Sequence, residues 1–324
     1  MNLRVSSFGG PSAGIDGSEN RRSSPAQKAL RDRLDGPSFS DDGGLYYRDN
    51  YEQSAGVVAF QNNVTYNGGG ALKLSVRPLG GSVDQNESER AEIWEKTELR
   101  VPYDQGVWYG FAVRFADPVP TDDHRYLIAQ WKREIDPGAE GDFSPFFAIR
   151  MRNGKLFATV ETNYIEEPAP VMMKAVQDHE VGIPVWLRPK TNQMRALVAT
   201  DPNWLPDDGD LFHARSDAIQ VVDHGNRLPT PDSGWIDFAV YTQPGPDGSG
   251  RIELYANARP IVTVTGHIGH ADRGLGDKQY FKFGPYRAPH DREWSLYYAD
   301  FRRSPERADV LGNVESAVLP TDSN

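Results

Sequence analysis

The sequence predicts an all-β fold, an antiparallel β-sandwich with long connecting loops, on three observations. From Leu45 onward the chain consists of short stretches that alternate apolar and polar residues and are rich in Val, Tyr, Phe, Trp and Thr. Gly, Pro, Asn and Asp interrupt these stretches at short intervals, as turns require. Helical periodicity extends over no convincing length. Together these features are typical of two antiparallel sheets packed face to face.

About twelve strands are expected, at residues 56–60, 71–76, 91–99, 106–115, 126–132, 146–152, 155–162, 235–241, 251–257, 260–265, 280–286 and 295–302. The dipeptide Asn153-Gly154 suits a two-residue hairpin turn, because both positions tolerate a positive φ. A second hairpin is expected around Asn257 and Ala258. The Pro-rich residues 167–232 are expected to form long excursions between strands.

The chain of 324 residues can bury a sizeable core. The strand-rich region contains neither an evident internal repeat nor a linker of distinct composition. We therefore expect one β domain at residues 41–305, preceded by a flexible N-terminal arm at 1–40 and followed by a polar tail at 306–324.

Composition excludes several classes of function. No apolar run approaches the roughly 18 residues of a membrane span, so no membrane association is expected. The absence of cysteine excludes disulfides, thiolate metal sites and a cysteine nucleophile. The net charge of -11 disfavours a nucleic-acid partner bound through bulk charge. A cleavable signal is not visible in the first forty residues. We expect the protein to be a monomer.

Strand alternation predicts a polar sheet face within this acidic chain. Because residues i and i+2 of a strand share a face, three groups point outward: Arg90 with Glu92, Gln130 with Lys132, and Tyr280 with Lys282 and Tyr286. Arg150 and Arg152 add further cations from the strand before the Asn153-Gly154 turn. Such a face suits an acidic polymer. The alternative is an ordinary solvated face on which the stems of Lys and Arg cover apolar surface.

Four motifs occur in the order and approximate spacing found in β-jelly-roll polysaccharide lyases: 88–92 (Ser-Glu-Arg-Ala-Glu), 108–110 (Trp-Tyr-Gly), 130–132 (Gln-Trp-Lys) and 280–287 (Tyr-Phe-Lys-Phe-Gly-Pro-Tyr-Arg). Over residues 45–303 the chain resembles the group of heparin lyase I and glucuronan lyase, and more distantly the alginate lyases. The resemblance implies an antiparallel β-jelly roll with a cleft on its concave sheet. It also implies β-elimination from a uronate-containing acidic polysaccharide.

The resemblance implies roles for individual residues. Removing the C5 proton of a 4-linked uronate requires that the neighbouring carboxylate is neutralised, and Arg90 and Gln130 match the neutralising residues of the family. Tyr286 matches its catalytic tyrosine, which can act as acid, as base, or as both when the two groups are syn. A tyrosine acting as a base at neutral pH needs nearby cations, such as Lys282 or Arg90, to stabilise the phenolate.

Lys132 departs from the family pattern, because many relatives carry histidine two residues after the glutamine. A lysine can neutralise the substrate carboxylate, or act as the base if desolvation lowers its pKa. We favour neutralisation, with Tyr286 performing both proton transfers. A loop histidine could also replace the missing imidazole, and the candidates are His124, His213 and His224. The residues expected to bind substrate are Glu92, Lys282, Tyr280, Arg150 and Arg287.

No cofactor is expected. The seven histidines form no metal-binding run, so no zinc site is predicted. The acidic run at residues 207–210 could hold a structural Ca²⁺, although oxygen-rich loops are usually only solvated.

Two other functions stay open. A β-sandwich glycoside hydrolase would need a pair of carboxylates, yet the positions at i, i+2 and i+4 hold Glu92, Trp94 and Lys96. A non-catalytic carbohydrate-binding protein would have no use for a tyrosine beside a lysine and an arginine. The particular uronate polymer and endo or exo action stay open as well. The substrate class favours a secreted or periplasmic protein, while the sequence itself leaves localisation unknown.

Overall fold

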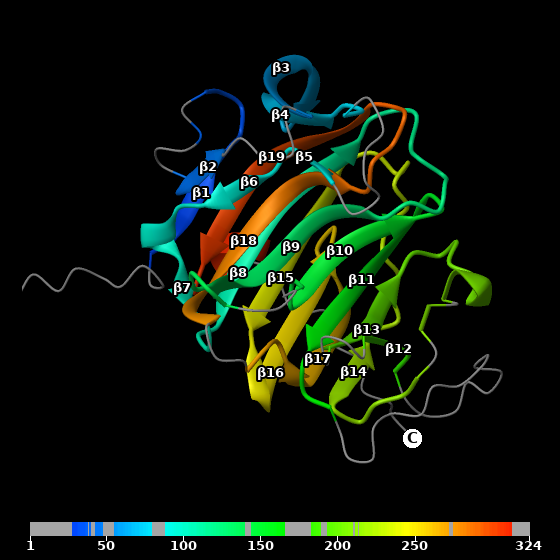
Figure 1. Cartoon of the computed structure of the whole chain (residues 1–324). Helices are drawn as coiled ribbons and strands as arrows, with labels where there is room; N and C mark the ends of the chain where they lie inside the picture. Colours follow the sequence, from blue (N-terminus) through cyan, green and yellow to red (C-terminus); the bar gives the residue numbers. More distant parts are fainter. Residues whose placement is uncertain are drawn as a thin grey trace, which may run out of the picture.

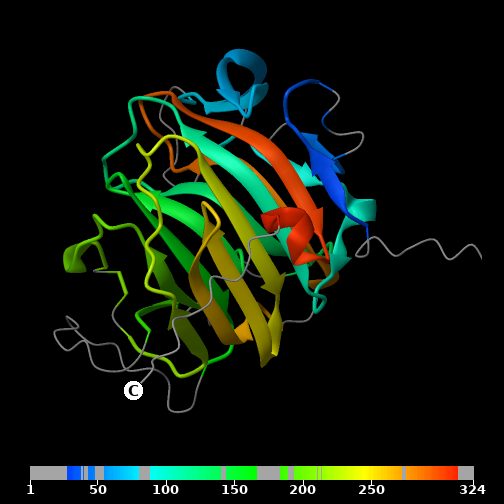
Figure 2. The same cartoon turned by 180° about the vertical axis from the view of Figure 1, so that it is seen from behind.

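The computed structural model describes residues 28–37, 39, 43–47, 55–79, 88–139, 144–165, 183–188, 193–209, 211–212, 214–271 and 275–312. Over these residues the chain forms two antiparallel sheets that pack face to face as a jelly-roll-like β-sandwich (Figures 1 and 2). The all-β prediction is confirmed. No helix in the described part of the chain has the length and apolar character to cross a membrane.

The first sheet has nine strands. Eight lie in the order β14 (Ile219–Asp223), β17 (Arg259–Ile268), β16 (Gly245–Ala256), β15 (Ile236–Gln243), β8 (Val107–Phe115), β19 (Trp294–Ser304), β4 (Gly69–Val76) and β3 (Gly56–Tyr66), and β1 (Leu30–Asp32) also pairs with β19. A short helix, α2 (Arg307–Leu311), contacts β19 and β8 of this sheet (Figure 2).

The second sheet has ten strands and faces the viewer in Figure 1. Eight lie in the order β12 (Val185–Arg188), β13 (Gln193–Thr200), β11 (Lys155–Thr162), β10 (Phe147–Arg152), β9 (Tyr126–Ile135), β18 (Leu275–Arg287), β6 (Ile93–Glu95) and β2 (Leu45–Tyr47). Two short strands, β5 (Glu89–Arg90) and β7 (Val101–Pro102), also pair with β18. Two 3-10 helices, η2 (Thr97–Leu99) and η3 (Pro206–Gly209), lie in connections.

Aromatic side chains from alternate strand positions fill the space between the sheets. Trp131 and Phe281 of the second sheet stack with ring centroids 4.5 Å apart, and Phe111 of the first sheet lies 5.3 Å from Phe281. All three are fully buried. Since the side chains of successive strand residues point to opposite faces, burying these rings turns Gln130 and Lys282 to the outer face of the second sheet.

Both predicted hairpins are confirmed. Asn153 and Gly154 have φ values of 52° and 71° between β10 and β11. Asn257 and Ala258 have φ values of 51° and 62° between β16 and β17. Positive φ at both central positions matches the right-handed twist of the flanking strands.

The structure corrects the expectation that residues 167–232 only connect strands. The described part of that stretch contains β12, β13 and β14, which extend the two sheets. In β13, Met194, Ala196 and Val198 alternate inward and pack in the core. The alternation was present in the sequence, but the surrounding prolines and polar residues obscured it.

Elements of the described chain also lie outside residues 41–305, the expected range of the β domain. Leu30 and Leu34 are buried in the core, and β1 pairs with β19. At the other end, Val310 of α2 packs with Trp108 and Tyr255 on the outer face of the first sheet. The remainder of the expected arm and tail lies outside the described residues.

Candidate active site

A pocket of about 240 Å³ opens on the outer face of the second sheet. Its lining comes from β5, β9, β10, β12, β13 and β18 and from two connections, and consists of Arg90, Arg125, Leu127, Gln130, Lys132, Ser144, Pro145, Arg150, Trp186, Arg188, Arg195, Lys282 and Tyr286. Seven of these thirteen described residues are cationic and none is acidic. A net charge of -11 for the chain therefore coexists with a concentrated positive site.

Glycine at position 284 allows the strand that carries Tyr286 to meet β5. The pairing of β18 with β9 shifts register between Phe283 and Tyr286. Gly284 has a φ of 129°, and a Cβ atom there would lie 2.0 Å from the carbonyl oxygen of Ala91. Only glycine fits this conformation and this close approach. The backbone N–H of Ala91 donates to the carbonyl of Pro285 at 2.9 Å, and Tyr286 pairs in register with Arg90.

Two guanidinium groups lie against the ring of Tyr286. The Cζ atom of Arg90 lies 4.2 Å from the ring centroid, and that of Arg125 lies 4.8 Å from it. Arg90 is held by hydrogen bonds from Nε and Nη2 to the hydroxyl of Ser88, at 3.2 and 3.0 Å. Both distances to the ring are within the range of cation–π attraction. The phenol therefore lies in a strongly cationic environment.

A buried carboxylate orients two of the pocket residues from behind. The Nζ atom of Lys282 lies 3.0 Å from Oε2 of Glu92, and the amide nitrogen of Gln130 donates to Oε1 of the same carboxylate. The Glu92 and Lys282 side chains are 3% and 4% exposed. Because an ionised carboxylate only accepts hydrogen bonds, Gln130 must present nitrogen to Glu92, leaving its oxygen and second N–H for other contacts.

A second buried carboxylate holds two further cations. Arg150 Nη2 and Arg195 Nε lie 3.0 and 2.6 Å from Oε1 of Glu161. Burial alone would raise the pKa of Glu161, but Arg195 and Arg150 more than offset it and hold the pKa below its usual value. Burial and Arg195 lower the pKa of Arg150 to about 9, so that Arg150 stays charged at neutral pH. One carboxylate thus supports two guanidiniums.

The structure brings together six of the nine residues predicted for the site. Arg90, Gln130, Lys132, Arg150, Lys282 and Tyr286 all line the pocket. Arg150 comes from β10 and Lys132 from β9, so the group spans four neighbouring strands. Glu92 lies directly behind the pocket and positions Gln130 and Lys282 rather than lining it.

The other two predicted substrate contacts, Arg287 and Tyr280, lie outside the pocket lining. Arg287 is 1% exposed and forms a 2.6 Å ion pair with Glu89, since strand alternation turns it away from the face of Tyr286. Tyr280 shares the outer face, but it is 8% exposed and is covered by Arg100, whose Cζ lies 4.2 Å from the Tyr280 ring. The structure therefore does not bring either residue into the pocket lining.

Four pocket residues with clear binding chemistry were not singled out from the sequence: Arg125, Trp186, Arg188 and Arg195. The Cζ atoms of Arg195 and Arg188 lie 4.6 and 5.4 Å from the Trp186 ring, which gives the β12–β13 end an aromatic surface flanked by cations. Recognising β12 and β13 as strands would have supplied the signal, because Trp186 and Arg188 stand at i and i+2.

The loop residues considered in the sequence analysis have other surroundings. His224 hydrogen-bonds Thr263 of the first sheet at 3.0 Å, away from the pocket, and His213 lies outside the described residues. His124 precedes Arg125 and lies 3.0 Å from Asp122. In the acidic run at 207–210, the carboxylate of Asp208 accepts from Lys155 at 2.6 Å, so its charge stabilises the fold. Asp210 is outside the described residues.

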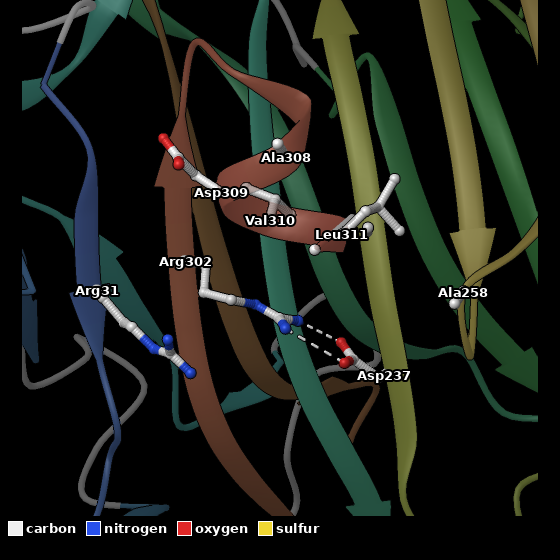
Figure 3. Close-up of a pocket in the computed structure, with 10 residues that line it drawn as sticks. Arg31, Asp237, Ala258, Arg302, Ala308, Asp309, Val310 and Leu311 are labelled. Carbon is white, nitrogen blue, oxygen red and sulfur yellow. Dashed lines mark hydrogen bonds and ion pairs between the residues drawn. The ribbon is translucent and has the colours of Figure 1, made fainter. Parts of the chain in front are cut away.

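The first sheet carries a different pocket, of about 350 Å³, beneath α2 (Figure 3). Arg302 lies on its floor, and both of its terminal nitrogens interact with the carboxylate of Asp237 (Figure 3). Arg31, which also lines this pocket, pairs with Asp300 at 2.8 Å. Both of these guanidiniums are therefore paired with carboxylates.

The chain belongs to the polysaccharide lyase family, because the model of that family, described as "Polysaccharide lyase", matches residues 42–302. No curated protein sequence matches the chain. Among solved structures, an endo-β-1,4-glucuronan lyase from the fungus Trichoderma reesei is similar, with a TM-score of 0.54 and 16% identity over 87% of this chain and 97% of that chain. The alginate lyase Aly36B is similar with a TM-score of 0.42 and 10% identity over 86% of this chain and 96% of that chain.

Proposed function

We propose that this polysaccharide lyase cleaves a uronate-containing polymer by β-elimination in the cationic pocket of the second sheet, with Tyr286 transferring the proton. The observation that carries the proposal is the contact of Tyr286 with Arg90 and Arg125 in a pocket whose described lining has seven cationic residues and no acidic one. A polymer with a carboxylate on each residue is the substrate that such a pocket attracts. Charge complementarity also orients the sugar acid toward the phenol.

Arg90, Gln130 and Lys132 would neutralise the carboxylate of the sugar from which the proton is removed. The electron pair of the C5–H bond moves toward this carboxylate and then forms the C4=C5 double bond, while the C4–O4 bond breaks. Positive charge and an amide donor at the carboxylate lower the energy of the intermediate anion. Gln130 donates one N–H of its amide to Glu92 and keeps the second N–H for this contact.

Tyr286 would perform both proton transfers. As phenolate it takes the proton from C5, and as phenol it returns that proton to O4 of the leaving sugar, so that the residue ends in its starting form. The neighbouring guanidiniums of Arg90 and Arg125 interact favourably with the phenolate. Lys132 lines the same pocket and is the other candidate base. A Lys132→Gln variant tests whether Lys132 acts as the base or only helps to neutralise the carboxylate.

The pocket chemistry disfavours glycoside hydrolysis. A retaining hydrolase uses two carboxylates about 5 Å apart at the scissile bond. The described lining contains no carboxylate, and the two carboxylates behind it, Glu92 and Glu161, are engaged with cations. The arrangement therefore offers cations for an anion rather than a pair of acids for a glycosidic oxygen.

The direct experiment follows the C4=C5 double bond, which absorbs ultraviolet light through conjugation with the carboxylate. The purified chain would be incubated with glucuronan, alginate and a heparin-like glycan, and absorbance would be recorded beside reducing-end release. Glucuronan is the first substrate to test, because the first-named structural relative is a glucuronan lyase. New reducing ends with absorbance support elimination, and new reducing ends without absorbance would contradict it.

A further inference from the structure

Three metal-ligating side chains meet beside the pocket, from two connections far apart in the sequence. Asp122 and His124 lie between β8 and β9, and His290 lies between β18 and β19. Asp122 Oδ1 lies 3.0 Å from His124 Nδ1, and Asp122 Oδ2 lies 3.2 Å from His290 Nε2. One ligand atom from each of the three residues lies within 4.8 Å of the others.

We propose that Asp122, His124 and His290 bind one Zn²⁺ ion. Two imidazole nitrogens and a carboxylate oxygen are donors that Zn²⁺ takes at about 2.0–2.2 Å, which places neighbouring ligands about 3.3 Å apart in a tetrahedron. The separations of 3.0 and 3.2 Å from Asp122 are close to this value, and each involves a different oxygen of its carboxylate. The third pair closes by a rotation of the His124 ring, whose side chain is 43% exposed. Water completes the coordination.

The nitrogen donors distinguish this site from one for Ca²⁺ or Mg²⁺, because those ions prefer oxygen ligands. These side chains are partly buried but can still be reached from solvent: His290 is 12% exposed and Asp122 is 37% exposed. The hydroxyl of Tyr126 lies 3.0 Å from each oxygen of Asp122, which fixes the carboxylate between the two rings. The site is therefore preorganised on two of its three ligands.

Contacts behind His290 fit a metal ligand as well. Its Nδ1 atom lies 3.0 Å from Oδ1 of Asp291, and a ring N–H donated to a carboxylate leaves Nε2 to bind a metal. The backbone N–H of Arg292 lies 3.1 Å from the same Nδ1, so the metal-free ring can instead hold its proton on Nε2 and donate to Asp122. Zinc binding would displace that proton and favour the contact with Asp291.

The site would act as a clamp next to the catalytic tyrosine. Arg125 follows His124 directly and lies against the Tyr286 ring, with its Cζ 4.8 Å from the centroid. The backbone N–H of Ala288 donates to the carbonyl of Arg125 at 3.3 Å, so the two connections already touch. A zinc ion bridging them would hold Arg125 in place. The metal site itself is independent of the proposed elimination chemistry.

The test measures zinc binding directly on the full, tag-free chain after EDTA treatment and dialysis. Isothermal titration with Zn²⁺ should show one site per chain, and zinc should raise the melting temperature, because a ligand of the folded state stabilises it. Ca²⁺ at the same concentration should have no effect on the site. Failure to bind Zn²⁺ stoichiometrically would overturn the proposal.

Three variants and one control locate the site. His290→Gln and His124→Gln should each weaken zinc affinity by more than tenfold, and Asp291→Asn should weaken it by about tenfold through loss of its support for His290. His224→Gln, an exposed histidine on the first sheet, should bind zinc as the wild type does. If His290→Gln destabilises the metal-free chain, the zinc affinity of His124→Gln, a variant of an exposed residue, tests the site instead. Unchanged affinity in His124→Gln would exclude this site.

Discussion

The two outer faces of the sandwich differ in how their charged side chains are paired. Beneath α2 on the first sheet, Arg302 pairs with Asp237 (Figure 3). Arg31 pairs with Asp300, which also lies 3.5 Å from Arg302, so two carboxylates balance these two guanidiniums. On the second sheet, seven cations line one pocket and the carboxylates behind them serve as shared supports. Arg150 and Arg195 share Glu161. Matched charges stabilise a fold, whereas an excess of one sign favours a ligand of the opposite sign.

The largest effect that separates the two faces is expected from removing one hydroxyl. Tyr286→Phe should lower kcat by about 1,000-fold, because it removes the proposed acid and base while keeping the ring against Arg90 and Arg125. Tyr66→Phe, on the first sheet, is the matched control and should leave kcat unchanged. Initial rates of ultraviolet product formation measure both. A Tyr286→Phe enzyme of normal activity would remove the tyrosine from the mechanism.

Glu92→Gln tests whether the buried carboxylate is a support of the pocket. The change leaves the Lys282 ammonium, which is 4% exposed, without its ionic partner, and should lower the free energy of unfolding by about 3 kcal/mol. Adding Lys282→Met should recover most of this loss, since the uncompensated charge is then removed. Urea unfolding measures both proteins. If the single variant is as stable as the wild type, the ion pair does not hold the site together.

Removing one cation from each face should give different results. Arg90→Ala should lower kcat/KM by about 100-fold on a uronate polymer, because it removes positive charge from the substrate carboxylate and from Tyr286. Arg31→Ala, whose side chain is 67% exposed beside Asp300, should change kcat/KM and stability little. Steady-state kinetics and thermal unfolding compare the two. Equal kinetic losses would show that the excess charge of the second sheet has no special role.

The smallest expected effect is a pH dependence of stability that originates at Glu161. Its folded pKa is held below the ordinary value of 4.5, so its charged form contributes stability above pH 4.5 that is lost as the pH falls through the folded pKa. The free energy of unfolding should therefore fall less steeply below pH 4.5 in Glu161→Gln than in the wild type. Urea unfolding at several acidic pH values measures the slopes, and identical slopes would contradict the assignment.

The alternation of side chains along a strand explains which parts of this site could be predicted from the sequence. Alternation is local, so it correctly placed Gln130 and Lys132 opposite Trp131, and Lys282 opposite Phe281. The same rule turns Arg287, the neighbour of Tyr286, away from the pocket and toward Glu89. Family resemblance supplied the order of the motifs, and the β5–β18 pairing explains why motifs separated by nearly two hundred residues meet.

Other features depend on contacts that no local pattern encodes. Trp186 and Arg195 line the pocket from β12 and β13, two strands that are hard to recognise in the sequence because their surroundings are rich in proline. The meeting of His124 with His290 requires two connections at the same end of the sandwich, which follows only from the strand order. Contacts between segments that are far apart in the sequence therefore could not be predicted from local patterns.

The most direct test is a crystal structure of Tyr286→Phe with a uronate oligosaccharide bound. We expect the sugar in the pocket of the second sheet, with one carboxylate within hydrogen-bond distance of Arg90 and Gln130 and with C5 facing the ring at position 286. An oligosaccharide bound instead beneath α2 on the first sheet, or one whose carboxylates avoid both residues, would contradict it.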